Sequence, residues 1–458
     1  MTSSHRLDAV RAAALDGRAQ TIYYKLDQLE KLRDALAAEA GAILEVMSRD
    51  SGASRAENKV EFALAMLVLR RRYSELEAGR ALEDEYRIAN GVNAPDRRLG
   101  PGIVVIEPCL HTAFFSLIAP LVGAIAGGNV IVVQMENSTR RLPTLLKSII
   151  STALDHDSIA FVTEPVRLDT PHLVIAQRGT VNTALSCPSH HIASPSDSRA
   201  VAIVDRDADF DAAALTLANA RFAHGGRSPH APDIVLVNEF VKDRLLQALV
   251  RVGIGAAERP SATKKGLDST VTSLQRSHGA RIVAQGDSTA ILDLPAGGAA
   301  LPTAKVGEPV LVVRSVTSLD DAIDKLTTSS GPFLYLAGYF FGTPATGKYL
   351  SQFIPSQVSF INHIPPEILV GPAFPYGHAV DPHDRYPAAL FTVPSPAFVG
   401  PPVEHGQLLE PTAVGAPSDI RDAAAQAFFS AALTPLAVAK RQKQLNAGFG
   451  YFEQAFDI

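Results

Sequence analysis

Cysteine is scarce in this chain, because only Cys109 and Cys187 occur among its 458 residues. Two thiols are too few for a disulfide framework or for a zinc site built from thiolates, and they fit a reducing compartment. A surplus of positive charge is also missing: 42 Lys and Arg stand against 47 Asp and Glu, for a net charge of −5. Binding to a phosphate backbone requires a basic patch, so no nucleic-acid partner is expected.

Long uninterrupted apolar runs are lacking as well. The N-terminus has no apolar core of the kind found in signal peptides, and a cytoplasmic location is expected. Residues 114–133 contain only two plainly polar side chains, Ser116 and Asn129, but the Gly127-Gly128 pair interrupts them. The β-branched residues that follow are typical of a buried strand. We therefore predict a buried helix and a strand here, and no membrane span.

What the sequence does contain is ordinary globular composition, 47% apolar and 19% charged, over a length that suits two or three domains. Apolar residues at helical spacing predict helices over 21–47 and 55–76. From GIVVIE onward, short apolar runs alternate with amphipathic stretches, which indicates an α/β fold with a parallel, doubly wound sheet. The pattern predicts three domains: 1–208, a second α/β unit over 209–394, and a Pro-rich then Ala-rich C-terminal segment over 395–458.

Five stretches occur in the order expected of one known scaffold: LGPGIVVIEP, APLVGAIAGGNVIVV, AVAIVDRDADFDAA, APDIVLV and GEPVLVV. In these the chain resembles the aldehyde dehydrogenase superfamily, most closely its class-3-like branch, over nearly its whole length. The resemblance implies a Rossmann-like cofactor-type domain, an α/β catalytic-type domain and a small bridging element. That element would include a hairpin at about 82–98, and it implies a homodimer. A shared scaffold does not by itself fix the function.

The residues that carry the family's chemistry are replaced. These enzymes oxidise aldehydes with NAD or NADP through a thiohemiacetal on a cysteine, and that cysteine falls at Pro229 in this chain. The glutamate that activates water falls near Pro195. A proline ring can neither attack a carbonyl nor leave as a thiolate, and it cannot act as a base. We therefore predict the loss of both the covalent step and its general base.

The family's dinucleotide site is altered in the same way. The lysine that holds the adenine ribose becomes Gln134, and the glutamate at the nicotinamide ribose becomes Lys305. The Gly-rich helix start reads Arg178 to Thr183, with side chains where two glycines are expected. Those glycines let the backbone approach a pyrophosphate. No cofactor is therefore expected to bind.

Other reactive side chains remain near the expected cleft. The family's oxyanion turn corresponds to the stretch from Pro108 to His111, so Cys109 or His111 would lie at the mouth of the tunnel. A thiol beside an imidazole can serve as a nucleophile and its base, although a free Cys is more often a small buried residue. The loop opposite offers His224, at the family's asparagine position, with Arg227 and Ser228. Imidazole suits proton transfer near neutral pH, and Arg227 could hold a carboxylate or enolate oxygen.

Other polar groups are read as structural. We expect His230 to be solvated, and we expect the same of His190-His191 and of the group from His378 to Asp384, since neither set has zinc-ligand spacing. No metal site is predicted. The acidic residues between Asp205 and Asp211 are expected to cap the helix that follows.

Two functions fit these features, and a third stays open. The chain is predicted to be a cofactor-independent, non-redox enzyme of isomerase, cyclase or lyase type, acting on a hydrophobic small molecule of specialised metabolism. The residues expected to act are His224, His111, Cys109, Arg227 and Ser228. The second function is that of a non-catalytic pseudoenzyme that associates with an active enzyme. The third is an NAD(P)-dependent aldehyde dehydrogenase with its nucleophile relocated to Cys109.

Overall fold

A computed structural model describes residues 3–135, 138–165, 168–178, 191–253, 264–297, 300–329, 334–400, 412 and 415–435. The chain forms two compact units, one of Met1–Glu85 with Asp96–Pro396 and a smaller one of Tyr86–Pro95 with Ala397–Ile458. Cys187, His190 and the stretch 179–183 lie outside the described residues, so the predictions made for them stay predictions.

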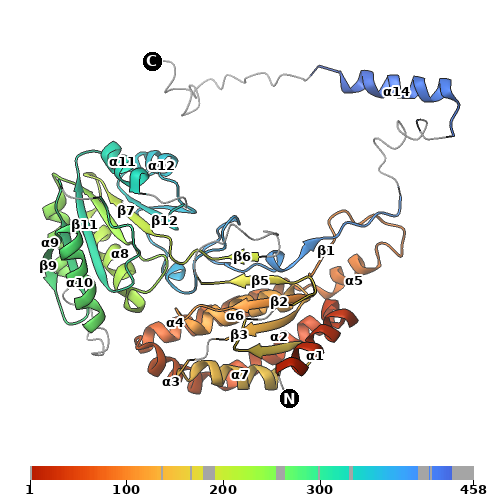
Figure 1. Ribbon diagram of the computed structural model, residues 1–458, viewed down its shortest axis with the longest axis horizontal. Coiled ribbons are helices and arrows are strands. Elements are labelled where there is room, and N and C mark those ends of the chain that lie inside the picture. Colours follow the sequence, from red (N-terminus) through yellow and green to blue (C-terminus); the bar gives the residue numbers. More distant parts are fainter. Residues whose placement is uncertain are drawn as a thin grey trace. The chain divides into compact units, whose positions relative to one another are not determined.

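The larger unit contains a five-stranded parallel sheet (Figure 1), in the order β4-β3-β2-β5-β6. Its strands are β2 (Ile103–Glu107), β3 (Val130–Gln134), β4 (Ile159–Val162), β5 (Leu173–Ala176) and β6 (His191–Ala193). The helices around it are α1 (Ser3–Asp16), α2 (Ile22–Ala38), α3 (Ala40–Ser51), α4 (Arg55–Glu75), α6 (Ala113–Ala126) and α7 (Leu142–Ala153), and η1 (Arg18–Gln20) joins α1 to α2.

Alternation along the strands divides these helices between two faces. Ile103 and Val105 pack with α1, whereas Val104 and Ile106 belong to the larger core formed with α2, α3, α4, α6 and α7. Successive side chains of a strand point to opposite faces, so a strand of continuous apolar residues is buried on both sides. The strand end that carries the expected turn is thereby held in a rigid layer.

The second sheet of this unit has seven strands, in the order β13-β12-β7-β8-β11-β10-β9, and β9 alone runs antiparallel to its neighbour. Its strands are β7 (Ala200–Val204), β8 (Ile234–Asn238), β9 (Arg281–Gln285), β10 (Ala290–Leu294), β11 (Val310–Val316), β12 (Ala337–Phe341) and β13 (Ser359–Ile361). Helices α8 (Phe210–Phe222) and α9 (Lys242–Gly253) share a core on one face. Residues of α10 (Lys264–His278), α11 (Leu319–Ser329) and α12 (Pro344–Phe353) share the core on the other face.

The predicted α/β class with parallel sheets is confirmed. The sheets change between Ala193 and Ala200, which is earlier than the boundary expected at 208, because β7 pairs with β8 and β12. The chain also returns to the first core near its end. Val370, Tyr386 and Phe391 are buried there, in or near η5 (Pro366–Leu369) and η6 (Ala388–Phe391). This late segment therefore helps to build the edge of the five-stranded sheet.

The stretch of about 82–98, where a bridging hairpin is expected, contains the end of a helix and a short strand. Helix α5 (Ala78–Tyr86) continues to Tyr86, as its Ala, Leu, Glu and Arg content favours. The strand β1 (Arg98–Leu99) pairs with β14 (Val393–Pro394), far along the chain. Within the smaller unit, Ala94 pairs with Ala397, and α14 (Ser418–Ala432) follows. None of the described helices has the length and apolar character that crossing a membrane needs.

Candidate functional site

The turn after β2 places Cys109 under the first residues of α6. The Cys109 backbone N–H donates to Gln177 Oε1 at 3.0 Å, and Gln177 Nε2 donates to the Ser116 carbonyl at 2.8 Å, which ties the turn to the end of β5. The Cys109 thiol lies 3.3 Å from the His111 carbonyl oxygen and 3.2 Å from Ser116 Oγ. Burial raises the pKa of the Cys109 thiol, so it stays protonated and bonded to the turn.

His111 is partly buried and has a defined tautomer. Its Nε2 lies 2.8 Å from the Leu369 carbonyl oxygen, and a carbonyl can only accept, so Nε2 carries the proton and Nδ1 is an acceptor. Burial lowers the pKa of His111 to about 3, with smaller contributions from the nearby His224, Arg385 and Arg227. The imidazole is therefore neutral at physiological pH and offers a lone pair at Nδ1.

The loop after α8 brings a second imidazole to His111. The two rings of His111 and His224 meet edge to face, with 5.7 Å between their centroids. His224 has φ 50° and is followed by Gly225 and Gly226, which also have positive φ. Only glycine adopts this region easily, so His224 is held against a conformational preference. Glu57 of α4 contributes to this, since its Oε1 accepts from the His224 backbone N–H at 2.6 Å.

Beneath the loop lies a buried network of charges. Asp233 Oδ2 accepts from Lys305 Nζ at 3.2 Å, and its Oδ1 lies 3.6 Å from Arg221 Nη1. Lys305 also donates to the carbonyl oxygens of Pro229 and Ser198, at 2.6 and 2.8 Å. Arg221 donates to the Gly226 carbonyl oxygen at 2.6 Å. Lys305, at the position of the family's ribose-binding glutamate, therefore stabilises the loop through hydrogen bonds to its backbone.

The other predicted loop residues are dispersed. Arg227 is exposed, whereas Ser228 is buried and its Oγ accepts from the His230 backbone N–H at 3.3 Å. The expectation that His230 is solvated was wrong: the side chain is fully buried, with its ring 4.9 Å from that of Phe374. Tyr339 fixes this position by donating to the His230 carbonyl oxygen. Of the five expected catalytic residues, the structure brings the imidazole rings of His111 and His224 together, and it places the Cys109 thiol against the His111 backbone carbonyl oxygen.

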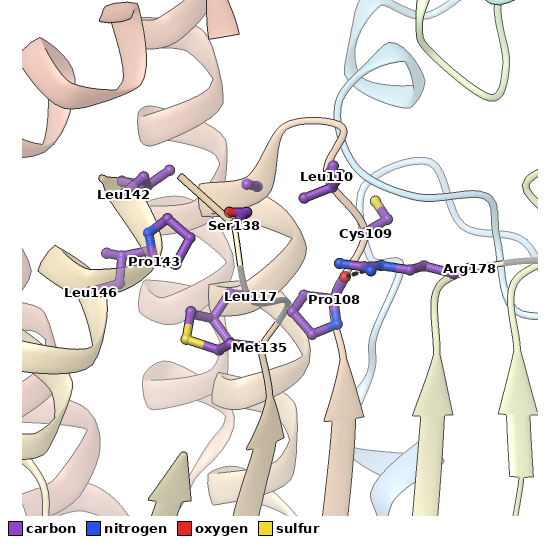
Figure 2. A pocket seen from close by; sticks show the side chains of 11 residues that line it. Pro108, Cys109, Leu110, Leu117, Met135, Ser138, Leu142, Pro143, Leu146 and Arg178 are labelled. Atoms are coloured by element: carbon purple, nitrogen blue, oxygen red, sulfur yellow. Dashed lines mark hydrogen bonds between the residues drawn. The ribbon is translucent and has the colours of Figure 1, made fainter. Parts of the chain in front are cut away.

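The crevice at the ends of β2 and β3 is small and apolar. Figure 2 shows Arg178 reaching from the end of β5 toward the turn, where its Nε donates to the Pro108 carbonyl oxygen at 2.8 Å. The remaining cavity is about 30 Å³, room for roughly one water. It is lined by Pro108, Cys109, Leu110, Ala113, Leu117, Met135, Ser138, Leu142, Pro143, Leu146 and Arg178. In parallel sheets, dinucleotides bind at such strand ends, next to small residues. Among the described residues, this strand end therefore offers a small apolar cavity with the Arg178 side chain beside it.

Two buried ionisable side chains were missed at the sequence level. Glu61 of α4 accepts from the backbone N–H groups of Phe114 and Phe115, at the start of α6, and burial raises its pKa to about 7. Arg385 is buried between the rings of Phe115 and Phe374. Neither follows a motif, so only the tertiary structure could reveal them.

The expected structural roles of the acidic residues are partly confirmed. Asp209 caps α8 by accepting from the backbone N–H groups of Asp211 and Ala212. Within the described part of the chain, no group of three or more His, Cys, Asp or Glu side chains could hold a metal ion.

The known proteins that are similar to this chain in sequence are aldehyde dehydrogenases. No protein-family model matches the chain. It is 24% identical over 258 residues to the putative aldehyde dehydrogenase AldX of Bacillus subtilis, which covers 52% of the chain and 57% of that protein. It is also 24% identical over 342 residues to 4,4'-diaponeurosporen-aldehyde dehydrogenase of Staphylococcus aureus, covering 67% and 73%. The first of these matches thus spans little more than half of the relative's length.

Solved structures extend the likeness to most of the chain. Substrate-bound AldH of Staphylococcus aureus superposes with a TM-score of 0.73 at 19% identity, covering 94% of this chain and 100% of that one. An NAD-dependent benzaldehyde dehydrogenase from Corynebacterium glutamicum gives a TM-score of 0.63 at 16% identity, covering 85% and 87%. At these identities the likeness establishes the fold. It does not establish the function, which depends on the residues of the site.

Proposed function

We propose that the chain is a member of the aldehyde dehydrogenase superfamily that has been repurposed for non-redox chemistry without NAD(P). Its substrate is a hydrophobic small molecule, and its reaction is a proton transfer of the isomerase, cyclase or lyase kind. The observation that supports this most directly is the contact between His111 and His224. It joins the turn of one sheet to the loop of the other, where the family places its chemistry.

The imidazole pair supports an acid–base role. His111 Nδ1 is left as an acceptor by the bond from Nε2 to the Leu369 carbonyl oxygen, so it can receive a proton from a bound carbon acid. The pKa of His111, about 3 in the free protein, makes it a weak base. Burial is the main cause of this low pKa, and an anionic intermediate beside the ring would raise it by favouring the protonated form. The Arg227 guanidinium would stabilise an enolate oxygen.

Two side chains at the family's cofactor-binding positions are engaged in contacts within the protein. Arg178 bonds to the Pro108 carbonyl oxygen across the strand ends, and Lys305 is engaged with Asp233 and with backbone carbonyls. Neither side chain is placed to bind a ribose hydroxyl. These contacts support a function that does not use a nicotinamide.

A relocated nucleophile at Cys109 receives less support. Its thiol is bonded to the His111 carbonyl oxygen and Ser116 Oγ and not to an imidazole, and its pKa is raised. A nucleophilic thiol needs a lowered pKa and an adjacent base. We expect Cys109→Ser to leave activity within about twofold, since a hydroxyl can keep the two hydrogen bonds.

The proposal is tested by hydrogen exchange without any cofactor. The purified chain would be incubated in D₂O with a panel of hydrophobic aldehydes, ketones and thioesters, and deuterium at the carbon next to the carbonyl would be measured by mass spectrometry. Catalysed uptake is expected with at least one compound class. His111→Gln and His224→Gln should each lower it by about 10²-fold or more, the usual contribution of a positioned acid or base.

A matched control is available in the same loop. His230→Gln removes an imidazole that is buried with its ring against Phe374, outside the ring contact between His111 and His224, so its folded fraction should exchange substrate normally. No catalysed exchange in any class, with a folded wild-type protein, would favour the non-catalytic partner function. The homodimer implied by the family, measurable by light scattering, is part of the proposal and is independent of this result.

A further inference from the structure

A groove separate from the imidazole pair lies between α4 and the segment 382–385. It has a volume of about 100 Å³ and is lined by Leu64, Leu67, Val68, Arg71, Phe115, Glu367, Pro382, His383 and Arg385. One wall is apolar, formed by three residues of α4 and by Phe115. At the mouth, Arg71 Nη1 donates to the His383 carbonyl oxygen at 2.9 Å. The groove thus combines aliphatic surface with guanidinium groups.

Arg385 is the unusual member of this lining. Its Nη1 donates to the Val370 carbonyl oxygen at 2.5 Å and its Nη2 to that of Ile368 at 3.2 Å, while its Nε is buried with no partner. Among the described residues no carboxylate lies within ion-pair distance of it. Burial lowers the pKa of Arg385 to about 10. A buried charge is normally paired with an opposite charge. The two acceptors of Arg385 are uncharged carbonyls, so its positive charge lacks such a pair.

Other buried arginines of the chain show the contrast. Arg72, on the same helix as Arg71, pairs with Asp384 and Glu75. Arg221 lies beside Asp233. Both satisfy their charge within the protein, whereas the acceptors of Arg385 are two neutral carbonyls. Two of its five N–H groups are used by these bonds, so it has donors left for an anion.

We propose that this groove binds a small aliphatic monocarboxylate, with the carboxylate group toward Arg385 and the chain against Leu64 and Val68. The apolar wall selects a hydrocarbon chain over a phosphate, and the volume limits that chain to a few carbons. Glu367 also lines the groove, and its carboxylate would repel a ligand that carries a second negative charge. The site does not depend on the proton-transfer function and can be tested without it.

The groove is connected to the imidazole pair through one short backbone segment. Ile368 and Val370 accept from Arg385, and Leu369 between them accepts from His111. A carboxylate that draws Arg385 toward the groove would therefore alter the bond made by His111. The NMR signals of the His111 imidazole provide a second readout of binding.

Butanoate is a suitable probe, with butan-1-ol as the neutral control of equal chain length. Calorimetric titration into the full chain should give saturable one-to-one binding in the millimolar range, with no binding of the alcohol at the same concentrations. Arg385→Gln should weaken binding at least tenfold, the effect of losing a charge-assisted hydrogen bond. The His111 imidazole signals should shift with the same dissociation constant in the wild type.

A surface variant decides the matter if Arg385→Gln does not fold. Leu67 is 57% exposed on α4, and Leu67→Asp places a carboxylate at the groove without disturbing the core. It should weaken butanoate binding roughly fivefold through repulsion. Leu215→Asp, at a leucine 50% exposed on α8, is the matched control and should change nothing. Equal binding of acid and alcohol, no saturation, or an unchanged affinity in Leu67→Asp would each overturn the proposal.

Discussion

The turn at 108–111 and the loop at 224–230 meet at the same imidazole pair but are held by different forces. The turn depends on neutral hydrogen bonds, from Gln177 to its backbone and from His111 to the Leu369 carbonyl. The loop is held by the buried charges of Arg221, Asp233 and Lys305. Charge-assisted bonds are stronger than neutral ones and more costly to break. The comparison explains how the loop can keep His224 and two glycines at positive φ, and it predicts unequal responses to mutation.

The largest effect is expected from Asp233→Asn. This change keeps the shape of the side chain but leaves Arg221 and Lys305 as buried cations without their shared carboxylate. Removing one partner of a buried ion pair costs about 3–5 kcal/mol of unfolding free energy. Chemical denaturation would measure it. Asp211→Asn is the control, because the side chains of Asp211 and its partner Arg251 are 77% and 69% exposed, and the loss there should be much smaller.

The next largest effect is expected for Glu61, a buried carboxyl group of α4 that accepts from the backbone at the start of α6. The pKa of Glu61 is about 7 in the native state against 4.5 as its ordinary value, so the native state binds the extra proton between these values. Stability from this group is complete below pH 4.5 and is lost as the pH rises through 7. The loss should approach ~3 kcal/mol. Glu61→Gln should remove this pH dependence. The unfolding free energy, measured at pH 5 and pH 8 for both proteins, should therefore change less with pH in the variant than in the wild type.

A smaller effect is expected where the turn is held by neutral bonds. Gln177→Met removes the acceptor for the Cys109 backbone N–H and the donor to the Ser116 carbonyl, both buried. We expect a loss of about 1–3 kcal/mol, the usual result of leaving such groups unsatisfied. A loss equal to that of Asp233→Asn, measured in the same denaturant, would contradict the contrast between turn and loop.

The smallest change has the opposite sign. His224→Gly relieves the positive φ of 50° while keeping the backbone N–H that Glu57 accepts. Stability should rise by about 0.5–1 kcal/mol, as expected for glycine in this conformation. Asn also tolerates such angles, so His224→Asn should be nearly neutral. A clear destabilisation by both variants would mean that the imidazole is held in place mainly by packing.

The scaffold was largely predictable from the sequence, whereas the site was predictable only in part. Continuous apolar runs such as those of β2 and β3 predict buried parallel strands, because a strand buried on both faces needs apolar residues at successive positions. The approach of His111 to His224 followed from the resemblance, which placed both at one cleft. The burial of His230 was missed because a histidine before a strand has no local feature that distinguishes a solvated ring from one packed on Phe374.

The other features that the sequence did not predict are long-range polar contacts. Glu57 and Glu61 look like exposed helix residues in the sequence, yet they accept from backbone groups 167 and 53 positions away. Arg385 acts on carbonyls of a segment whose path depends on Gly371, where a Cβ would come within 2.0 Å of the guanidinium. Such contacts are set by how the sheets and helices pack, so neither periodicity nor residue spacing could predict them.

The central claim is that the cleft works without a nicotinamide cofactor, and calorimetric titration of the full chain with NAD and NADP tests it most directly. The account predicts no saturable binding of either dinucleotide at millimolar concentration, and no nicotinamide reduction with a panel of hydrophobic aldehydes. Micromolar binding accompanied by reduction of the nicotinamide would contradict it. If that turnover were abolished by Cys109→Ala, the chain would be a dehydrogenase with a relocated nucleophile.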